Sequence, residues 1–217
     1  MQKYILSLII LMFSSQIFAQ GLSFSVVFDP QITWMNSDSK RIEKDGNSIG
    51  LGGGLVMDNY FAENYAFSTG LSILSTGGNL QFLDSLDFQN GGEIDTLPPG
   101  SIVKYRLQYL TIPISLKLKS NEIGYVRFFT HLGINAHINV KATADVNSKD
   151  ITGEDIRDEI QFFMLSYFIG GGLEYSLGGN TAIIGGIYFT SGIMDVTANS
   201  DYRAQISSLS LRLGIKF

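Results

Sequence analysis

Residues 22–34 read LSFSVVFDPQITW, and in this stretch large apolar side chains alternate with mostly small or polar ones. The apolar parity carries Leu22, Phe24, Val26, Phe28, Pro30, Ile32 and Trp34, and the other carries Ser23, Ser25, Val27, Asp29, Gln31 and Thr33. A period of two residues is that of a β-strand, whose successive side chains point to opposite faces. The stretch therefore predicts a strand with one apolar and one polar face.

Seven further segments show the same alternation, which predicts an all-β chain of eight strands. They lie at about residues 48–58, 65–75, 102–118, 125–140, 163–177, 181–191 and 208–217. We see no linker between them, so residues 20–217 are expected to form one domain.

The connections between these strands give a second pattern, because long and short ones alternate strictly. The long ones are about 36–47, 76–101, 141–161 and 192–204, and the short ones are near 59–64, 120–123 and 178–180. An antiparallel up-and-down barrel with tight turns at one rim and extended loops at the other has this arrangement. An even strand count returns both termini to the short-turn rim, which in outer-membrane barrels is periplasmic.

The fourth predicted strand is less regular than the others. Its apolar parity runs through Val103 and Leu107 to Tyr109 and then changes, so that Leu110 and the residues in step with it become apolar. A β-bulge near Tyr109 would explain the change. Pro113 removes a donor from the same strand, so a local irregularity is expected there too.

Alternation alone does not say which way the apolar face points. A soluble, lipocalin-like ligand binder would fill its narrow interior with the large side chains, whereas a barrel in lipid turns them outward. The predicted strands are long enough for a tilted membrane crossing of about 9 to 11 residues, and aromatic residues gather toward strand ends. These are Trp34, Tyr60, Phe61, Tyr65, Tyr105, Phe162, Phe163 and Phe189. We therefore predict an eight-stranded antiparallel up-and-down transmembrane β-barrel.

The N-terminus and the composition agree with an envelope protein. Lys3, an apolar run over residues 4–13 and the small-residue site Ile17-Phe18-Ala19 predict a cleaved secretory signal peptide at residues 1–19. The chain has no cysteine, which excludes a lipoprotein anchor and a disulfide or thiolate-metal scaffold. Its formal charge is -5, which argues against a nucleic-acid partner.

Three features together resemble the small outer-membrane β-barrels of Bacteroidetes, a Gram-negative group, that are called PorT-like and are grouped with OmpA- and OmpX-type barrels. They are Gln20 directly after Ala19, the segment YLTIPISLK at 109–117 and the ending LSLRLGIKF at 209–217. The ending looks like the terminal signal that the outer-membrane assembly machinery reads, with Phe217 as the aromatic last residue. The resemblance implies an integral protein of the cell outer membrane, with lipid and that machinery as partners. It does not establish a role in protein secretion.

Candidate chemistry is sparse. His131 and His137 share the polar parity of one predicted strand but are six residues apart, roughly 20 Å along it, so one metal ion could not bind both. Glu174 beside a basic residue could suggest a buried catalytic acid, but a lumen network of ion pairs and hydrogen bonds that plugs a narrow barrel is the favoured interpretation. The residues predicted for this network are Arg127, His131, His137, Glu174, Arg212 and Lys216.

The remaining motifs indicate no cofactor. The run Gly50-Leu-Gly-Gly-Gly54 lacks the Lys-Ser/Thr ending of a phosphate loop and lies within a predicted strand, so close interior packing explains it better. The acidic loops at 76–101 and 141–161 lack the spacing of a calcium loop, and a helical turn is possible within 153–160. No catalytic, cofactor-binding or metal-binding residue is assigned.

Three functional classes follow, in order of preference. The first is a non-enzymatic barrel with a structural or surface-interaction role through its long extracellular loops, whose extracellular or envelope partner is unknown. The second is a narrow solute pore, which eight strands disfavour. The third is a lipid-modifying enzyme, which needs a serine, a histidine and an acid converging at one rim, and the spacing does not show them.

Overall fold

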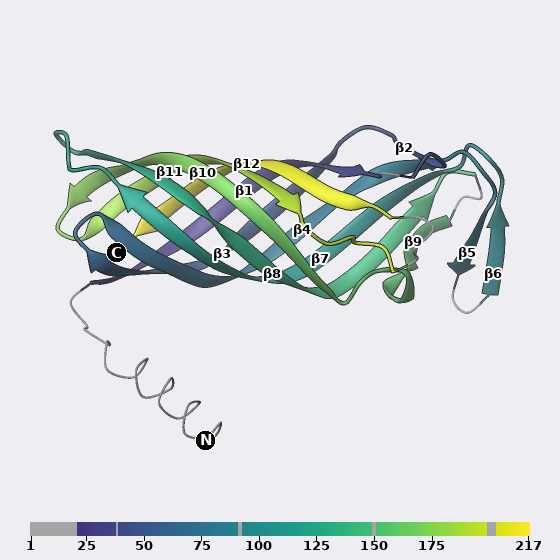
Figure 1. Ribbon diagram of the computed structural model, residues 1–217, viewed down its shortest axis with the longest axis horizontal. Coiled ribbons are helices and arrows are strands. Elements are labelled where there is room, and N and C mark those ends of the chain that lie inside the picture. The colour runs from purple at the N-terminus through teal and green to yellow at the C-terminus, as the bar shows by residue number, and fades with distance from the viewer. Residues whose placement is uncertain (1–20, 38, 91–92, 149–150, 199–202) are drawn as a thin grey trace, which may run out of the picture.

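The computed structural model describes residues 21–217 except 38, 91–92, 149–150 and 199–202. The predicted signal peptide lies outside the described residues. Eight long antiparallel strands of the described chain close into a barrel, as the sequence predicts (Figure 1). They are β1 (Leu22–Asn36), β3 (Ser48–Ala62), β4 (Tyr65–Phe82), β7 (Ile102–Lys119), β8 (Val126–Val146), β10 (Phe163–Gly178), β11 (Thr181–Gly192) and β12 (Gln205–Lys216).

Each barrel strand pairs with the next along the chain, and β12 returns to pair with β1, from Ser25 opposite Lys216 to Asn36 opposite Gln205. Closure leaves the barrel without a free edge. Strands in lipid need this closure because unpaired backbone amides would find no hydrogen-bond partner there. The predicted alternation of connections is confirmed. Tight turns follow β3, β7 and β10, and both ends of the described chain lie at that rim (Figure 1).

The turn between β10 and β11 depends on glycine. Gly178 and Gly179 have φ values of 103° and 60°, in the left-handed region that other residues rarely adopt. Two such residues in succession make a hairpin turn whose twist matches that of the flanking strands.

The long-loop rim carries the remaining elements (Figure 1). The short strand β2 (Ile42–Lys44) pairs with β4, β9 (Ile151–Asp155) pairs with β8, and β5 (Leu86–Asn90) forms a separate hairpin with β6 (Glu93–Leu97). The 3-10 turn η1 (Arg157–Glu159) lies where the sequence allowed a helical turn. The prediction was wrong about how far three strands run, because β3 continues past residue 58 to Ala62, β4 past 75 to Phe82 and β8 past 140 to Val146.

In the half of the barrel nearer the short turns, the apolar parity faces outward and is exposed all around the wall. Leu55, Leu71, Ile134, Ile169 and Leu211 are each 42–57% exposed, although they are large and apolar. A water-soluble barrel would bury these side chains, so this band is the lipid-facing surface. No helix of the described residues is long and apolar enough to cross a membrane.

Aromatic residues border this band at both ends. Toward the long loops, the ring of Phe189 lies 6.4 Å from that of Trp34 and 6.5 Å from that of Tyr167. At the short-turn end, Tyr125 lies 6.2 Å from Tyr175. Two such belts mark the two interfaces of the bilayer.

The irregularity predicted in β7 is present, but its explanation was wrong. The register between β7 and β8 shifts between Gln108 and Tyr109, with Val140 as the extra residue on β8. The parity of β7 itself does not change, because Val103 and Tyr109 are buried on the same side as Lys117. What changes at Tyr109 is the environment, since the interior becomes apolar and the outer face polar.

Pro113 is accommodated without a register shift. It remains opposite Asn135 of β8, and the pairs between β4 and β7 stop at Ile114 and resume at Thr111. The lost pairs are the local irregularity that the missing donor predicts.

Beyond Tyr109, the long-loop half of the barrel has a hydrophobic core inside it, like a water-soluble protein. Buried apolar side chains from six barrel strands, from β2 and β6 and from the loops meet there. They are Met35, Ile42, Leu80, Phe82, Leu97, Val103, Tyr105, Leu107, Tyr109, Ala142, Ala144, Val146, Ile156, Ile160, Met164, Val196, Ala204 and Ile206. We call this half the extension and these residues the apolar plug.

Candidate functional site

The candidate site lies in the barrel lumen between the apolar plug and the short-turn rim. The part of it nearest the short-turn rim is a buried ion cluster. Lys117 Nζ lies 2.7 Å from Asp58 Oδ2 and 2.7 Å from Glu174 Oε1. Lys216 Nζ lies 3.2 Å and Lys119 Nζ 3.9 Å from the other oxygen of Glu174. We call these five residues the ion cluster. They come from β3, β7, β10 and β12, so the cluster joins strands across the lumen.

Aromatic rings complete the ion cluster. Lys119 Nζ lies 4.1 Å and Lys216 Nζ 5.4 Å from the ring centre of Tyr60. Lys117 Nζ lies 5.1 Å from that of Phe129. Ring faces attract cations, so these contacts help to hold ammonium groups that the barrel wall removes from water.

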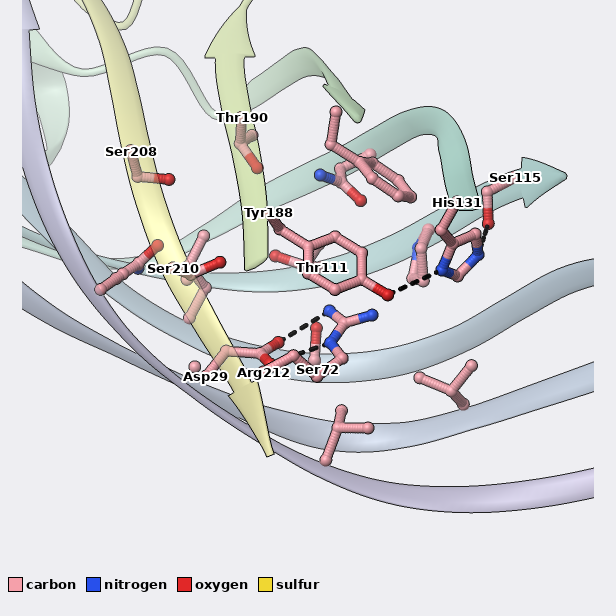
Figure 2. A pocket seen from close by; sticks show the side chains of 18 of the residues that line it. Asp29, Ser72, Thr111, Ser115, His131, Tyr188, Thr190, Ser208, Ser210 and Arg212 are labelled. Carbon is pink, nitrogen blue, oxygen red and sulfur yellow. Dashed lines mark hydrogen bonds and ion pairs between the residues drawn. The ribbon is translucent and has the colours of Figure 1, made fainter. Parts of the chain in front are cut away.

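Between the ion cluster and the apolar plug lies a polar chamber of about 80 Å³ (Figure 2). Arg212 of β12 donates hydrogen bonds of 2.9 and 2.7 Å to the two carboxylate oxygens of Asp29 on β1, and its guanidinium lies 4.1 Å from the ring centre of Tyr188. The Tyr188 hydroxyl lies 3.1 Å from His131 Nδ1, and Ser115 Oγ lies 2.7 Å from His131 Nε2. Figure 2 shows these contacts as one chain across the chamber.

Glycine makes room for this chain. A Cβ at Gly170 would lie 2.3 Å from Tyr188 Cδ1, so the ring occupies the space that a side chain there would fill. Gly50, in the glycine-rich run of β3, likewise leaves room for Gln31, whose Nε2 would lie 2.9 Å from a Cβ at that position. This is the close interior packing that the sequence predicts.

His137 makes contacts separate from those of His131. Its Nδ1 lies 2.8 Å from Thr111 Oγ1, and its Nε2 lies 2.8 Å from Ser166 Oγ. Each imidazole thus has both ring nitrogens hydrogen bonded inside the barrel. Within the described residues, no group of three or more histidine, cysteine, aspartate or glutamate side chains is placed to hold a metal ion.

The structure brings five of the six predicted network residues into the lumen but not as one cluster. Glu174 and Lys216 belong to the ion cluster, while Arg212 binds Asp29 rather than Glu174. Arg127 corrects the prediction, because its half-exposed side chain lies at the short-turn rim and pairs with Glu122. Its place at the rim follows from its position as the second residue of β8, where it lies opposite Glu174 of β10.

Sequence reasoning missed Lys117, Asp58 and Asp29. Both aspartates stand on the polar parity of their strands, which is the signal that identifies lumen residues. Lys117 likewise stands on the polar parity of its strand beyond Tyr109, on the face away from Leu116 and Leu118, and the structure places it on the inner face.

The acidic loops are partly neutralised by arginine. Arg106 pairs with Asp145, and Arg41 Nε lies 3.3 Å from Asp84 Oδ2. Hydrogen bonds from Arg157 hold the pKa of Asp155 below its ordinary value. The extension thus has a mixed, solvated surface outside its apolar plug.

Fold and lumen together define a transmembrane β-barrel of eight strands whose interior is filled rather than open. The chain belongs to the outer membrane protein beta-barrel domain family, whose model matches residues 15–198. A search of curated protein sequences finds no match. The protein is therefore an integral outer-membrane protein that sits in the membrane lipid.

Solved structures of outer-membrane barrels are similar to the chain. Neisserial surface protein A has a TM-score of 0.52 at 13% identity, covering 91% of this chain and 98% of that one. The attachment invasion locus protein of Yersinia pestis, in complex with the heparin analogue sucrose octasulfate, has a TM-score of 0.44 at 15% identity, covering 91% and 100%. OprG from Pseudomonas aeruginosa has a TM-score of 0.40 at 14% identity, covering 91% and 97%. At these identities the likeness concerns the fold.

Proposed function

We propose that this protein is a non-enzymatic, non-conducting outer-membrane barrel that presents its extension to a partner outside the cell. The observation that carries the proposal is the apolar plug. Met35, Leu80, Leu107 and Tyr109 are fully buried where a pore would need an aqueous path. A lumen filled by packed side chains suits a rigid support rather than a channel.

The proposal includes an orientation, with the extension outside the cell and the short-turn rim with both termini in the periplasm. The alternation of long loops and tight turns supports it, because bacterial barrels place tight turns in the periplasm. Phe217 pairs with Phe24 by backbone hydrogen bonds, which bring the two ends of the barrel together at the short-turn rim. Membership of the PorT-like barrels of Bacteroidetes is part of the same proposal and rests on the resemblance.

Conductance in a planar lipid bilayer tests the closed lumen. We expect the purified barrel to give no discrete channels, because the apolar plug and the ion cluster block the lumen at two separate places along its axis. Leu107→Ser with Tyr109→Ser is the matched variant, since it makes the plug polar while leaving the ion cluster in place. Steady channel openings by the wild-type barrel would contradict the proposal and favour the solute pore.

Surface labelling tests the orientation. Because the chain has no cysteine, an introduced cysteine is the only thiol that can be labelled. Lys104→Cys places a thiol on the outer face of the extension, and Asn180→Cys places one on an exposed tight turn. In intact cells a membrane-impermeant maleimide should label only the first variant, and in lysed cells both. Labelling of only the Asn180→Cys variant in intact cells would reverse the orientation.

A lipid-modifying hydrolase is the second candidate, favoured by the contact between Ser115 and His131. A serine hydroxyl hydrogen bonded to an imidazole is the arrangement of an activated nucleophile. The third member here is Tyr188 rather than a carboxylate, and all three side chains are buried inside the barrel rather than at a rim. A fluorophosphonate probe should leave the wild-type protein unlabelled. Labelling that Ser115→Ala abolishes would support the enzyme instead.

A further inference from the structure

The ion cluster contains more cationic than anionic groups. Among the described residues, the carboxylates of Asp58 and Glu174 are the ones that its three lysine side chains contact, and Lys117 is 5% exposed. Lys119 and Lys216 share one oxygen of Glu174, so both ammonium groups lie within 4 Å of the same atom. Charges removed from water require compensation, and one ammonium charge of the cluster has no carboxylate of its own.

Lys119 is the ammonium with the weakest contacts. Its side chain is 8% exposed, yet its contact with Glu174 is 3.9 Å, which is too long for a hydrogen bond. Its other contact is with the ring of Tyr60, and a ring face accepts no strong hydrogen bond. Within the described part of the chain, this nine-tenths-buried ammonium has donors available for a ligand.

The space for such a ligand is open at the short-turn rim. A hollow of about 370 Å³ is lined by Tyr60, Lys119 and Arg127, and a second of about 340 Å³ is lined by Tyr60, Arg127 and Lys216. The two hollows thus share Tyr60 and Arg127. Three cationic side chains therefore surround one mouth of the lumen.

Two carboxylates also face this mouth. Glu63 lines the first hollow but is exposed to solvent, and Glu122 is paired with Arg127. Because exposed carboxylates remain hydrated, they compensate the buried lysines weakly.

We propose that the mouth of the barrel at the short-turn rim is a binding site for a small oxyanion, a phosphate or a carboxylate, held by Lys119 and Lys216 with Arg127 at the entrance. The oxyanion supplies the hydrogen-bond acceptors that the Lys119 ammonium lacks and balances the charge of the ion cluster. Tyr60 forms the wall against which both lysines are held.

Isothermal titration with inorganic phosphate, and separately with acetate, tests the site. The barrel is held in a maltoside detergent and a Tris buffer, so that neither detergent nor buffer carries an oxyanion. We expect saturable binding of at least one anion, and the two titrations distinguish phosphate from carboxylate. Lys119→Met keeps a side chain of similar length but removes the ammonium. It should weaken binding about ten- to one-hundredfold, the factor for one hydrogen bond to a charged group.

Lys104→Met, on the outer face of the extension, is the matched control and should bind as the wild type does. Glu174→Gln should strengthen binding, because it removes the carboxylate that competes for Lys119 and Lys216. The shift in electrophoretic mobility on heating confirms that each variant is folded. Absence of saturable binding of both anions by the wild type, or equal binding by Lys119→Met, would overturn the proposal.

Discussion

Replacement of Lys117 by methionine tests whether the ion cluster stabilises the barrel. The change keeps the length of the side chain but removes the ammonium from between Asp58 and Glu174. Asp58, 1% exposed, would then retain the 2.5 Å hydrogen bond from Ser68 but lose its ion pair with Lys117. Glu174 would keep its contacts with Lys216 and Lys119. The cost therefore comes mainly from one uncompensated buried carboxylate, and breaking a buried pair in this way costs roughly 3–5 kcal/mol.

Reversible urea unfolding in lipid vesicles measures this free energy. The single tryptophan of the chain, Trp34, lies in the belt toward the long loops, so its emission reports departure of the barrel from the membrane. Adding Asp58→Asn to Lys117→Met should recover about 2 kcal/mol, because the double variant has no orphaned carboxylate at residue 58. If the single variants lose less than about 1 kcal/mol each and their effects simply add, the ion cluster does not stabilise the fold as argued.

Two further predictions use the same unfolding measurement. Gly170→Ala should cost roughly 1–3 kcal/mol because its Cβ would meet the Tyr188 ring, whereas Gly185→Ala, which meets nothing within 4 Å, should be nearly neutral; equal losses would refute the packing argument. Leu211→Arg in the lipid-facing band should cost roughly 2–4 kcal/mol, while Gln108→Arg on the outer face of the extension should cost little. Similar costs at both positions would place the membrane boundary elsewhere.

The strand order, the strand number and the alternating connections could be predicted from the sequence because each depends on local patterns. A period of two residues identifies a strand without knowledge of its partner, as in residues 22–34. The side that meets lipid followed from the charge-free parity and the aromatic residues. These features are repeated in every strand, so one irregular segment did not obscure them.

Which side chains meet inside the barrel depends on the register between strands, and register is harder to predict from the sequence than the strands themselves. Asp29 meets Arg212 because β1 and β12, the first and last strands, pair at barrel closure, over 183 positions of sequence separation. Lys117 and Glu174 likewise meet across the lumen rather than along a strand. At Tyr109, a change in what surrounds the strand produces the same reversal of alternation that a bulge in β7 would produce, so the pattern alone does not distinguish the two.

Because of that reversal, the depth at which the protein sits in the bilayer is set by its side chains and not by its backbone. The β7–β8 ladder continues from lipid into water through a single bulge, so the sorting of side chains alone fixes the level at which the hydrocarbon ends. Exchanging the inner and outer side chains at one pair of positions would raise or lower that level while leaving strand number, closure and loops unchanged. A barrel built in this way can adapt to a thicker or thinner membrane by point substitutions, without gaining or losing a strand residue.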